Sequence, residues 1–393
     1  MTRAGWVAVT AAAVLLSLGY GLGYPELLAV GVGALALLAL GAVLVAGRPS
    51  VEVERQVEPP RVGRGDPAIA LLVVRNPSSR RRLRVEVVEP VTRTVGSRAD
   101  TTELRVAVPT LGRSGVRRRT YRLPTDRRGV LTVGPLRWER SDPCGLWRRR
   151  QEVEPVRTVY VNPRVHALDL AASGRARHLD GPTSDKAPRG SITFQALREY
   201  VRGDDMRLIH WRSSARLGTL MVKESVDTAM PHTTVLLDTR SSSYDSPDRF
   251  EEAVDVVASL LTAATGAQFP CRLVTTGGVQ AEGKGSTEET RALLDLLSGL
   301  DADSDAGFLA LADGLDHRRS NSTVVAVTGQ VQGPDAAADL AALRTLARRY
   351  DRGLLLRLVP LGAPPVGGSD DLVVLDSEGA LQAVTAWNVW SRR

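Results

Sequence analysis

The chain has 393 residues, more than one ordinary hydrophobic core holds, which indicates two or three domains. Its two cysteines, Cys144 and Cys271, lie far apart, which excludes a disulfide framework or a cysteine zinc site and fits a reducing compartment. Residues 51–230 carry 35 basic and 21 acidic side chains, whereas residues 231–393 carry 14 and 22. The basic middle is suited to anionic lipid, nucleic acid or the acidic half of the chain itself.

Residues 1–50 predict a transmembrane helical hairpin. Two uncharged stretches, 4–24 and 27–47, each have the length that a bilayer core requires, and a turn at residues 23–26 joins them. Arg3 precedes the first span and several arginines follow the second, which predicts cytoplasmic termini, a multi-pass protein of the plasma membrane and a cytoplasmic soluble body. A secretory signal peptide is the alternative, but it leaves the second stretch unexplained.

Residues 51–165 alternate apolar and polar side chains in short runs separated by Pro, Gly and Asn, which predicts a β-rich, sandwich-like domain. Three arginine triplets lie at residues 80–82, 117–119 and 148–150. They are suited either to protecting strand edges from aggregation or to attracting anionic lipids. Aromatic residues make up only 4% of the chain, so we expect no nucleic-acid partner.

Residues 166–190 are rich in Ser, Gly, Asp and Pro, and predict a linker or loop. The next segment, 191–230, is dense in functional side chains. Asp204 and Asp205 follow Gly203 and are suited to capping a helix that ends at Gly218. The alternative is a metal-dependent hydrolase built from Glu199, Asp204, Asp205 and His210, although their spacing matches no standard ligand pattern.

This segment resembles the signature of domain-of-unknown-function family 58. The residues that we assign to a signature or partner-binding surface are Arg198, Tyr200, Gly203, Asp204, Asp205, Arg207, Trp211, Arg216, Gly218 and Glu224. His210 departs from the family, which usually has an acid before the tryptophan. Because the segment directly precedes the next domain, we expect Trp211 and Arg216 to pack it against that domain.

Residues 231–393 alternate apolar strands with amphipathic helices, which predicts an α/β domain with a parallel sheet. Binding sites in such sheets lie beyond the carboxyl ends of the strands, so Asp238 and the loop after it are the expected site. Ser246 and Pro247 predict a helix start.

The family resemblance implies that this domain is von Willebrand factor A-like, with a metal site that begins Asp-x-Ser-x-Ser. In this sequence Asp238 and Ser242 match, but Arg240 replaces the first serine and Gly329 stands where an aspartate is usual. We therefore expect a degraded metal site, without Mg²⁺ or another cofactor. Arg240 is suited to supply a fixed cation beside Asp238.

No catalytic residues are assigned, and the sequence predicts a membrane-tethered scaffold or adaptor that binds a protein partner. The resemblance implies that this partner is a MoxR-type AAA+ ATPase in a bacterial cell-envelope process. The chain has no phosphate-binding loop of the Gly-x-x-x-x-Gly-Lys type, so we do not expect it to be the ATPase.

Overall fold

The computed structural model describes residues 1–46, 51–78, 85–170, 193–201, 206, 209–226, 231–311, 315, 322–330 and 336–392, with the backbone alone for 193–198 and 223–226. The chain divides into two compact units. The first comprises residues 1–163 with 298–301, and the second comprises the rest. The arginine triplet at 80–82 and most of the expected linker lie outside the described residues.

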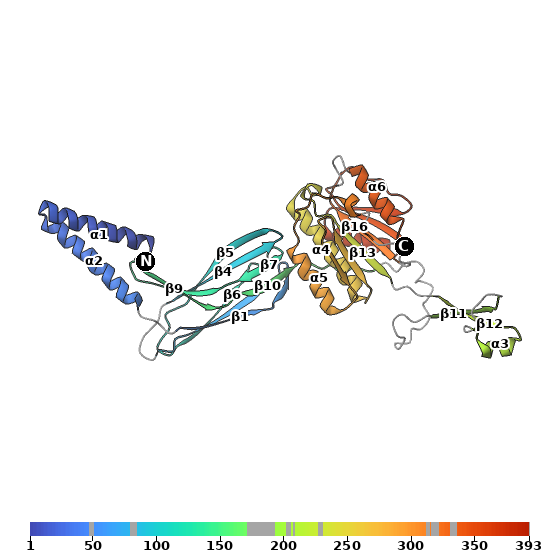
Figure 1. Cartoon of the computed structure of the whole chain (residues 1–393), viewed down its shortest axis with the longest axis horizontal. Coiled ribbons are helices and arrows are strands. Elements are labelled where there is room, and N and C mark those ends of the chain that lie inside the picture. The colour runs from blue at the N-terminus through green and yellow to red at the C-terminus, as the bar shows by residue number, and fades with distance from the viewer. Residues whose placement is uncertain are drawn as a thin grey trace. The chain divides into compact units, whose positions relative to one another are not determined.

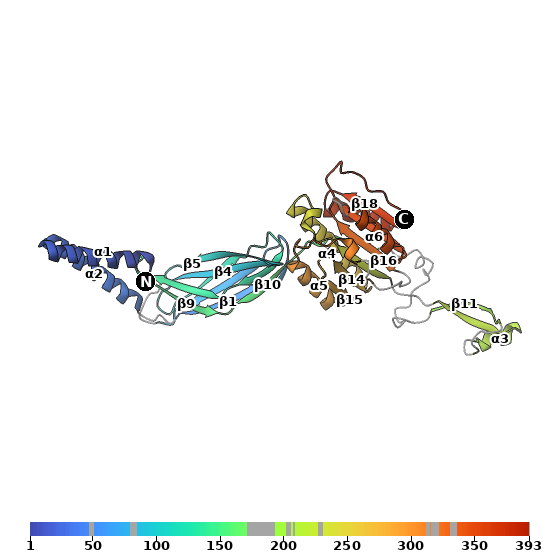
Figure 2. The same cartoon turned by 45° about the horizontal axis from the view of Figure 1, so that its top comes forward.

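The first unit begins with two apolar helices, α1 (Arg3–Leu22) and α2 (Pro25–Ala46), which lie side by side as a hairpin (Figures 1 and 2). Gly23 ends α1 with a φ of 72°, a left-handed conformation that glycine adopts without strain. The helices pack through small residues: a Cβ added at Gly31 would lie 2.7 Å from the side chain of Leu16. Both helices are long and apolar enough to cross a membrane.

The rest of the first unit is built from two sheets. One has the order β1 (Glu52–Glu58), β3 (Ile69–Arg75), β6 (Val116–Arg122), and all its pairs are antiparallel. The other has the order β2 (Arg61–Gly63), β10 (Arg157–Asn162), β7 (Gly129–Val133), β4 (Glu86–Val95), β8 (Leu136–Ser141), β9 (Arg148–Glu154), with β5 (Arg98–Ala107) paired to β4. Alternate residues of β1 and β3 are buried, as the period-two sequence pattern predicts.

The core between these sheets contains a buried ion pair as well as apolar side chains such as Leu72 and Trp138. Arg55 on β1 pairs with Glu89 on β4, and both side chains are fully buried. The hydroxyl of Tyr121 on β6 donates to the other oxygen of Glu89. The polar groups therefore connect one sheet to the other. Burial and the adjacent Glu89 raise the pKa of Tyr121 above its ordinary value.

The second unit contains a six-stranded sheet with the order β15 (Gln280–Gly283), β14 (Cys271–Thr275), β13 (His232–Leu237), β16 (Ser322–Thr328), β17 (Arg352–Leu358), β18 (Leu372–Ser377). All neighbouring pairs are parallel except β14 with β15. The helices of this domain are α4 (Pro247–Gly266), α5 (Thr287–Gly299), α6 (Ala336–Ala347) and α7 (Ala380–Ser391). A parallel α/β sheet is therefore confirmed.

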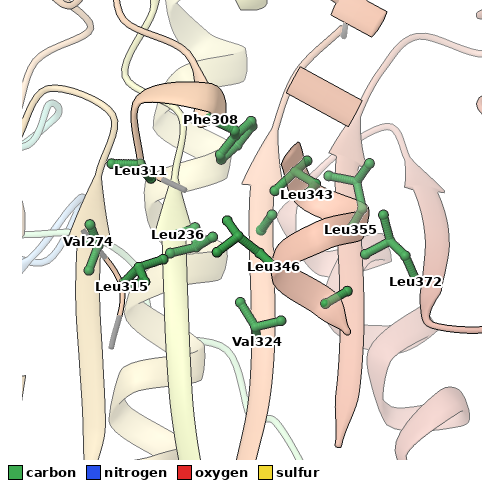
Figure 3. Close-up of a cluster of buried hydrophobic side chains, with 12 residues drawn as sticks. Leu236, Val274, Phe308, Leu311, Leu315, Val324, Leu343, Leu346, Leu355 and Leu372 are labelled. Atoms are coloured by element: carbon green, nitrogen blue, oxygen red, sulfur yellow. The ribbon is translucent and has the colours of Figure 1, made fainter. Parts of the chain in front are cut away.

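The side chains of α6 and of the 3-10 helix Phe308–Leu311 pack on one face of this sheet, against Leu236 and Val324 (Figure 3). Helices α4 and α7 contact each other, α4 also contacts β13, and α7 also contacts β18. Ser246 caps α4 and Pro247 begins it, as the sequence predicts. Before the expected linker, the backbone amide of Arg164 donates to Asp255 on α4 (2.8 Å).

The segment that carries the family signature forms a small module within the second unit. Strand β11 (Thr193–Glu199) pairs antiparallel with β12 (Met221–Val226), and α3 (Trp211–Leu217) lies between them in the sequence. Helix α3 begins at a different residue from the one expected. Its N-cap is His210, whose ring accepts a hydrogen bond from the amide of Ser213. Gly218 ends the helix with a φ of 73°, as predicted.

Candidate functional site

The charged cluster around Asp238 lies at the carboxyl end of β13, where the parallel sheet predicts a site. Asp238 is fully buried, and its amide donates to the carbonyl of Val327 at the end of β16 (3.0 Å). The carboxylate of Asp238 accepts from Ser243, which follows β13, and from Thr328, the last residue of β16. Asp238 therefore presents its carboxylate to the loops that follow β13 and β16.

Arg240 places a guanidinium between two buried carboxylates. Its Nε and Nη2 donate to Oδ1 and Oδ2 of Asp238 (3.0 and 2.8 Å), and its Nη1 lies 2.7 Å from Oδ2 of Asp339. Asp339, on α6, is 1% exposed. The hydrogen bond to Asp238 raises the pKa of Arg240 above its ordinary value, so the cation is permanent. The guanidinium thus lies beside Asp238 as a fixed cation, as the sequence predicts.

Two hydroxyl groups complete the shell of Asp238. Ser243 and Thr328 both donate to its Oδ2, at 2.7 and 2.8 Å, and the amide of Arg240 donates to Oδ1 at 3.0 Å. With the two guanidinium bonds, five donors reach one carboxylate, which has about four lone-pair sites. The carboxylate of Asp238 is therefore saturated by the protein, which does not favour a metal ligand role.

The sequence pattern missed three members of this cluster. Ser242, expected from the motif spacing, is exposed, and the neighbouring Ser243 is buried and bonded instead, because a 3-10 helix over 241–243 turns it inward. Asp339 lies about a hundred residues from Asp238, so local spacing gave no signal for it. Tyr244 donates its hydroxyl to the carbonyl of Asp238 (2.7 Å), and burial raises its pKa well above the ordinary value.

The residues around Asp339 leave no space for a larger side chain. A Cβ added at Gly307 would lie 2.5 Å from both carboxylate oxygens of Asp339 and 2.7 Å from Nη1 of Arg240. The amide of Leu309 donates to Oδ1 of Asp339 (3.0 Å). The backbone on this side therefore encloses the second carboxylate and fixes the guanidinium between its two partners.

The structure brings together only part of the signature surface. Gly203, Asp204, Asp205 and Arg207 lie outside the described residues. Arg198 and Glu224 lie on the paired strands β11 and β12, and the amide of Tyr200 donates to the carbonyl of Leu220 (2.7 Å). Arg216 is exposed on α3.

Trp211 is 67% exposed, so the expectation that it is buried against the next domain is wrong. Further large apolar side chains of the same module are exposed: Val201 (63%), Met206 (69%), Leu217 (62%) and Leu220 (46%). The buried residue of this short helix is Ser214, whose hydroxyl accepts a hydrogen bond from the amide of Met221 (2.8 Å). The apolar side chains Trp211 and Leu217 therefore remain exposed. The module therefore exposes five large apolar side chains, together with Arg212 and Arg216.

Of the four residues proposed for a hydrolase, the structure describes Glu199 and His210. Glu199 is exposed, and Nδ1 of His210 lies 2.8 Å from the hydroxyl of Ser213, within its own helix cap. Among the described residues no group of three or more His, Cys, Asp and Glu side chains is placed to hold a metal.

Several solved structures share weak similarity with the chain. The C-terminal domain of wzt is 14% identical, with a TM-score of 0.22, and the match covers 30% of this chain and 77% of that domain. The CARDB domain of the PF1109 protein from Pyrococcus furiosus is 16% identical, with a TM-score of 0.20 over 29% and 88% of the two chains. Scores this low carry no argument about fold or function.

The sequence comparisons are more informative. The uncharacterized protein YeaD of Bacillus subtilis (strain 168) is 29% identical over 145 residues, which are 36% of this chain and 35% of YeaD. The match thus spans about a third of that relative. Residues 196–351, from β11 to the end of the α6 region, match the family described as protein of unknown function DUF58, which confirms over this range the resemblance found in the signature segment.

Proposed function

We propose that the chain is a membrane-anchored adaptor whose signature module binds a protein partner. The observation that carries this proposal is the exposure of five large apolar side chains of the module, with Trp211 the largest of them. Exposed apolar patches mark interaction sites, and tryptophan and arginine are enriched among the residues that dominate binding energy. The face lies within the range that matches DUF58.

Membrane anchoring is supported by the exposure of the N-terminal helices. Val7 and Val43 are 66% and 72% exposed, and α2 carries no charge after Glu26. A soluble protein would bury such surfaces, whereas hydrocarbon solvates them. In this proposal the hairpin anchors the chain in the plasma membrane, and both following domains are cytoplasmic.

The Asp238 cluster is the stabilising centre of the von Willebrand factor A-like domain in this proposal. An internal guanidinium replaces the divalent cation, so partner binding is independent of metal. The partner, implied by the family resemblance, is a MoxR-type AAA+ ATPase of the cell envelope. A permanently charged and fully paired cluster suits a rigid docking domain better than a centre that exchanges ligands.

Binding of the purified MoxR-type ATPase to the full chain in lipid nanodiscs tests this proposal. We expect Trp211→Ala to weaken binding by about 30-fold, because a central tryptophan contributes about 2 kcal/mol or more. Leu381→Ala, on the 68% exposed Leu381 of α7, is the matched control and leaves affinity unchanged. Equal affinities for wild type and Trp211→Ala would reject the docking face, and no binding by wild type would reject the named partner.

A further inference from the structure

The three-stranded sheet of the first unit has one face that points away from the core. Leu72 on β3 and its cross-strand partner Arg55 on β1 are both buried, which identifies the inner face. Directly opposite residues of antiparallel strands share a face, so the alternate residues form the outer face. Nε of Arg75 lies 3.9 Å from Oε2 of Glu52, as expected for two side chains on this face. The rows of the outer face, from β1 across β3 to β6, are Glu52, Arg75 and Val116; Glu54, Val73 and Arg118; Gln56, Leu71 and Thr120; and Glu58, Ile69 and Arg122.

The outer face carries its charges in separate strips. All its residues on β1 and β6 are exposed. On β1 they include three carboxylates and no basic group, and on β6 they include two guanidinium groups and no acidic group. Between them lies an apolar strip on β3, where Ile69 is 44% exposed and Leu71 and Val73 are half-buried. An apolar strip therefore runs between an acidic strip and a basic strip.

The charges of these strips are not neutralised within the sheet. Strand β3 separates the acidic strip from the basic strip by two strand spacings, or about 10 Å. Among the residues that the structure describes, Glu54, Glu58, Arg118 and Arg122 have no ion-pair partner within 4.0 Å. The arginine triplet at 117–119, noted in the sequence, therefore supplies one of the two free cations of this face.

Charge complementarity selects a second copy of the chain as the occupant. When two identical sheets pack face to face about a two-fold axis parallel to β3, each acidic strip lies over the basic strip of the other copy, and the apolar strips meet. A two-fold axis across the strands would instead place each acidic strip over the other acidic strip. Pairing of the two β6 edges would bring arginines against arginines. Juxtaposed like charges are unfavourable, so only the first arrangement is favoured.

We propose that the outer face pairs with the outer face of a second copy of the chain. The axis parallel to β3 keeps each row level with the same row of the other copy. Glu54 therefore accepts hydrogen bonds from Arg118 of the partner subunit, and Glu58 accepts from Arg122 of the partner subunit. Each of these pairs occurs twice in the dimer, and Leu71 in the central apolar row packs against its own counterpart.

The face is small, so membrane confinement has to support the pairing. Its three strands of seven residues cover about 23 Å by about 14 Å, roughly 300 Å² per copy, compared with about 800 Å² per partner in a standard interface. The anchoring proposed above, on which this inference rests, holds all copies in one membrane and raises their effective concentration. An axis parallel to β3 also keeps both N-terminal hairpins at the same end of the dimer, as insertion into one membrane requires.

Cross-linking of the full chain in vesicles of dioleoyl phosphatidylcholine tests this pairing. Cys144→Ser removes the exposed native thiol, and Leu71→Cys then places one accessible thiol near the axis. Packed sheets lie about 10 Å apart, so a short bis-maleimide joins the two thiols more readily than a direct disulfide does. We expect Leu71→Cys to cross-link at least 10-fold faster than Glu103→Cys, the control on the exposed side chain of β5 in the other sheet.

Charge reversal in the Leu71→Cys chain identifies the partner. Arg118→Glu places carboxylates against carboxylates, and Glu54→Arg places guanidinium groups against guanidinium groups. Each single variant should cross-link at least 10-fold more slowly than its parent. The double variant Glu54→Arg with Arg118→Glu should recover the rate, because the two strips are again complementary. Thermal unfolding in detergent verifies that each variant is folded.

Equal cross-linking rates for Leu71→Cys and Glu103→Cys would overturn the pairing, even if a charge variant does not fold. A folded double variant no faster than the single variants would also overturn it. Loss of cross-linking in Arg118→Glu but not in Glu54→Arg would assign the face to an acidic partner instead of a second copy. Flotation of the vesicles separates these results from the anchoring. A chain that does not float rejects the anchoring, whereas a floating chain that cross-links at the control rate rejects only the dimer.

Discussion

At the scale of single residues, the candidate site depends on one guanidinium that two buried carboxylates share. Arg240 is held by Asp238 and Asp339, and both carboxylates are buried. The sequence correctly predicted the proximity of Arg240 and Asp238, because a residue two positions beyond a strand end is confined to the same edge of the sheet. It did not predict Asp339, since only the folded sheet brings α6 to this edge.

Truncation of Arg240 is expected to destabilise the second unit strongly. In Arg240→Ser two buried carboxylates lose their common cation, which costs about 3–5 kcal/mol of the free energy of unfolding. Chemical denaturation of the full chain in detergent measures this loss. Mg²⁺ at millimolar concentration should partly restore the stability of Arg240→Ser and leave wild type unchanged. Wild-type calorimetry that shows micromolar Mg²⁺ affinity, lost in Asp238→Ala, would contradict the internal-cation assignment.

The two cysteines differ in environment and therefore in reactivity. Burial raises the pKa of Cys271 to about 11, so at pH 8 its thiol is neutral in the folded protein, whereas Cys144 is exposed. We expect a thiol-specific disulfide reagent to modify one cysteine per chain at pH 8 and two in denaturant. Loss of the fast reaction in Cys144→Ser identifies the exposed residue. Equally fast modification of both thiols in the folded chain would show that Cys271 is not protected.

At the scale of elements, periodicity and caps predicted the architecture better than the site. The strands of both sheets and the start of α4 at Pro247 follow from local patterns. Helix α3 is the instructive error. Asp204 and Asp205 are good capping residues, but the cap of α3 is His210, whose amide donates to the carbonyl of Met221. The start of α3 therefore depends on the pairing of His210 with β12 rather than on the intrinsic capping preference of aspartate.

The buried pair between the two sheets of the sandwich gives an element-scale prediction. Glu89→Leu leaves Arg55 buried without its partner, and we expect a loss of about 3–5 kcal/mol in the free energy of unfolding. The double variant Arg55→Met with Glu89→Leu should recover most of this loss, because it removes both charges from the core. Denaturation of the single and double variants provides the comparison. A double variant no more stable than Glu89→Leu would show that the pair itself stabilises the fold.

At the scale of the whole molecule, the apolar hairpin and the cytoplasmic assignment rest on different evidence. Length and exposure of the two helices are structural properties, whereas orientation depends on charge. Arg3 begins α1, and Arg55, Arg61 and Arg64 follow α2, while the only charged residue near the turn between the helices is Glu26, in the first turn of α2. Basic residues near span ends are retained on the cytoplasmic side. The charge distribution therefore predicts a single orientation.

Reporter fusions test that orientation in cells. We expect green fluorescent protein fused after Arg393 to fluoresce and alkaline phosphatase at the same position to be inactive, because both report a cytoplasmic C-terminus. Alkaline phosphatase inserted between Gly23 and Tyr24, in the turn that joins the helices, should be active, since this turn faces the other side. An active phosphatase after Arg393 would reverse the orientation. A cytoplasmic ATPase would then have no access to Trp211.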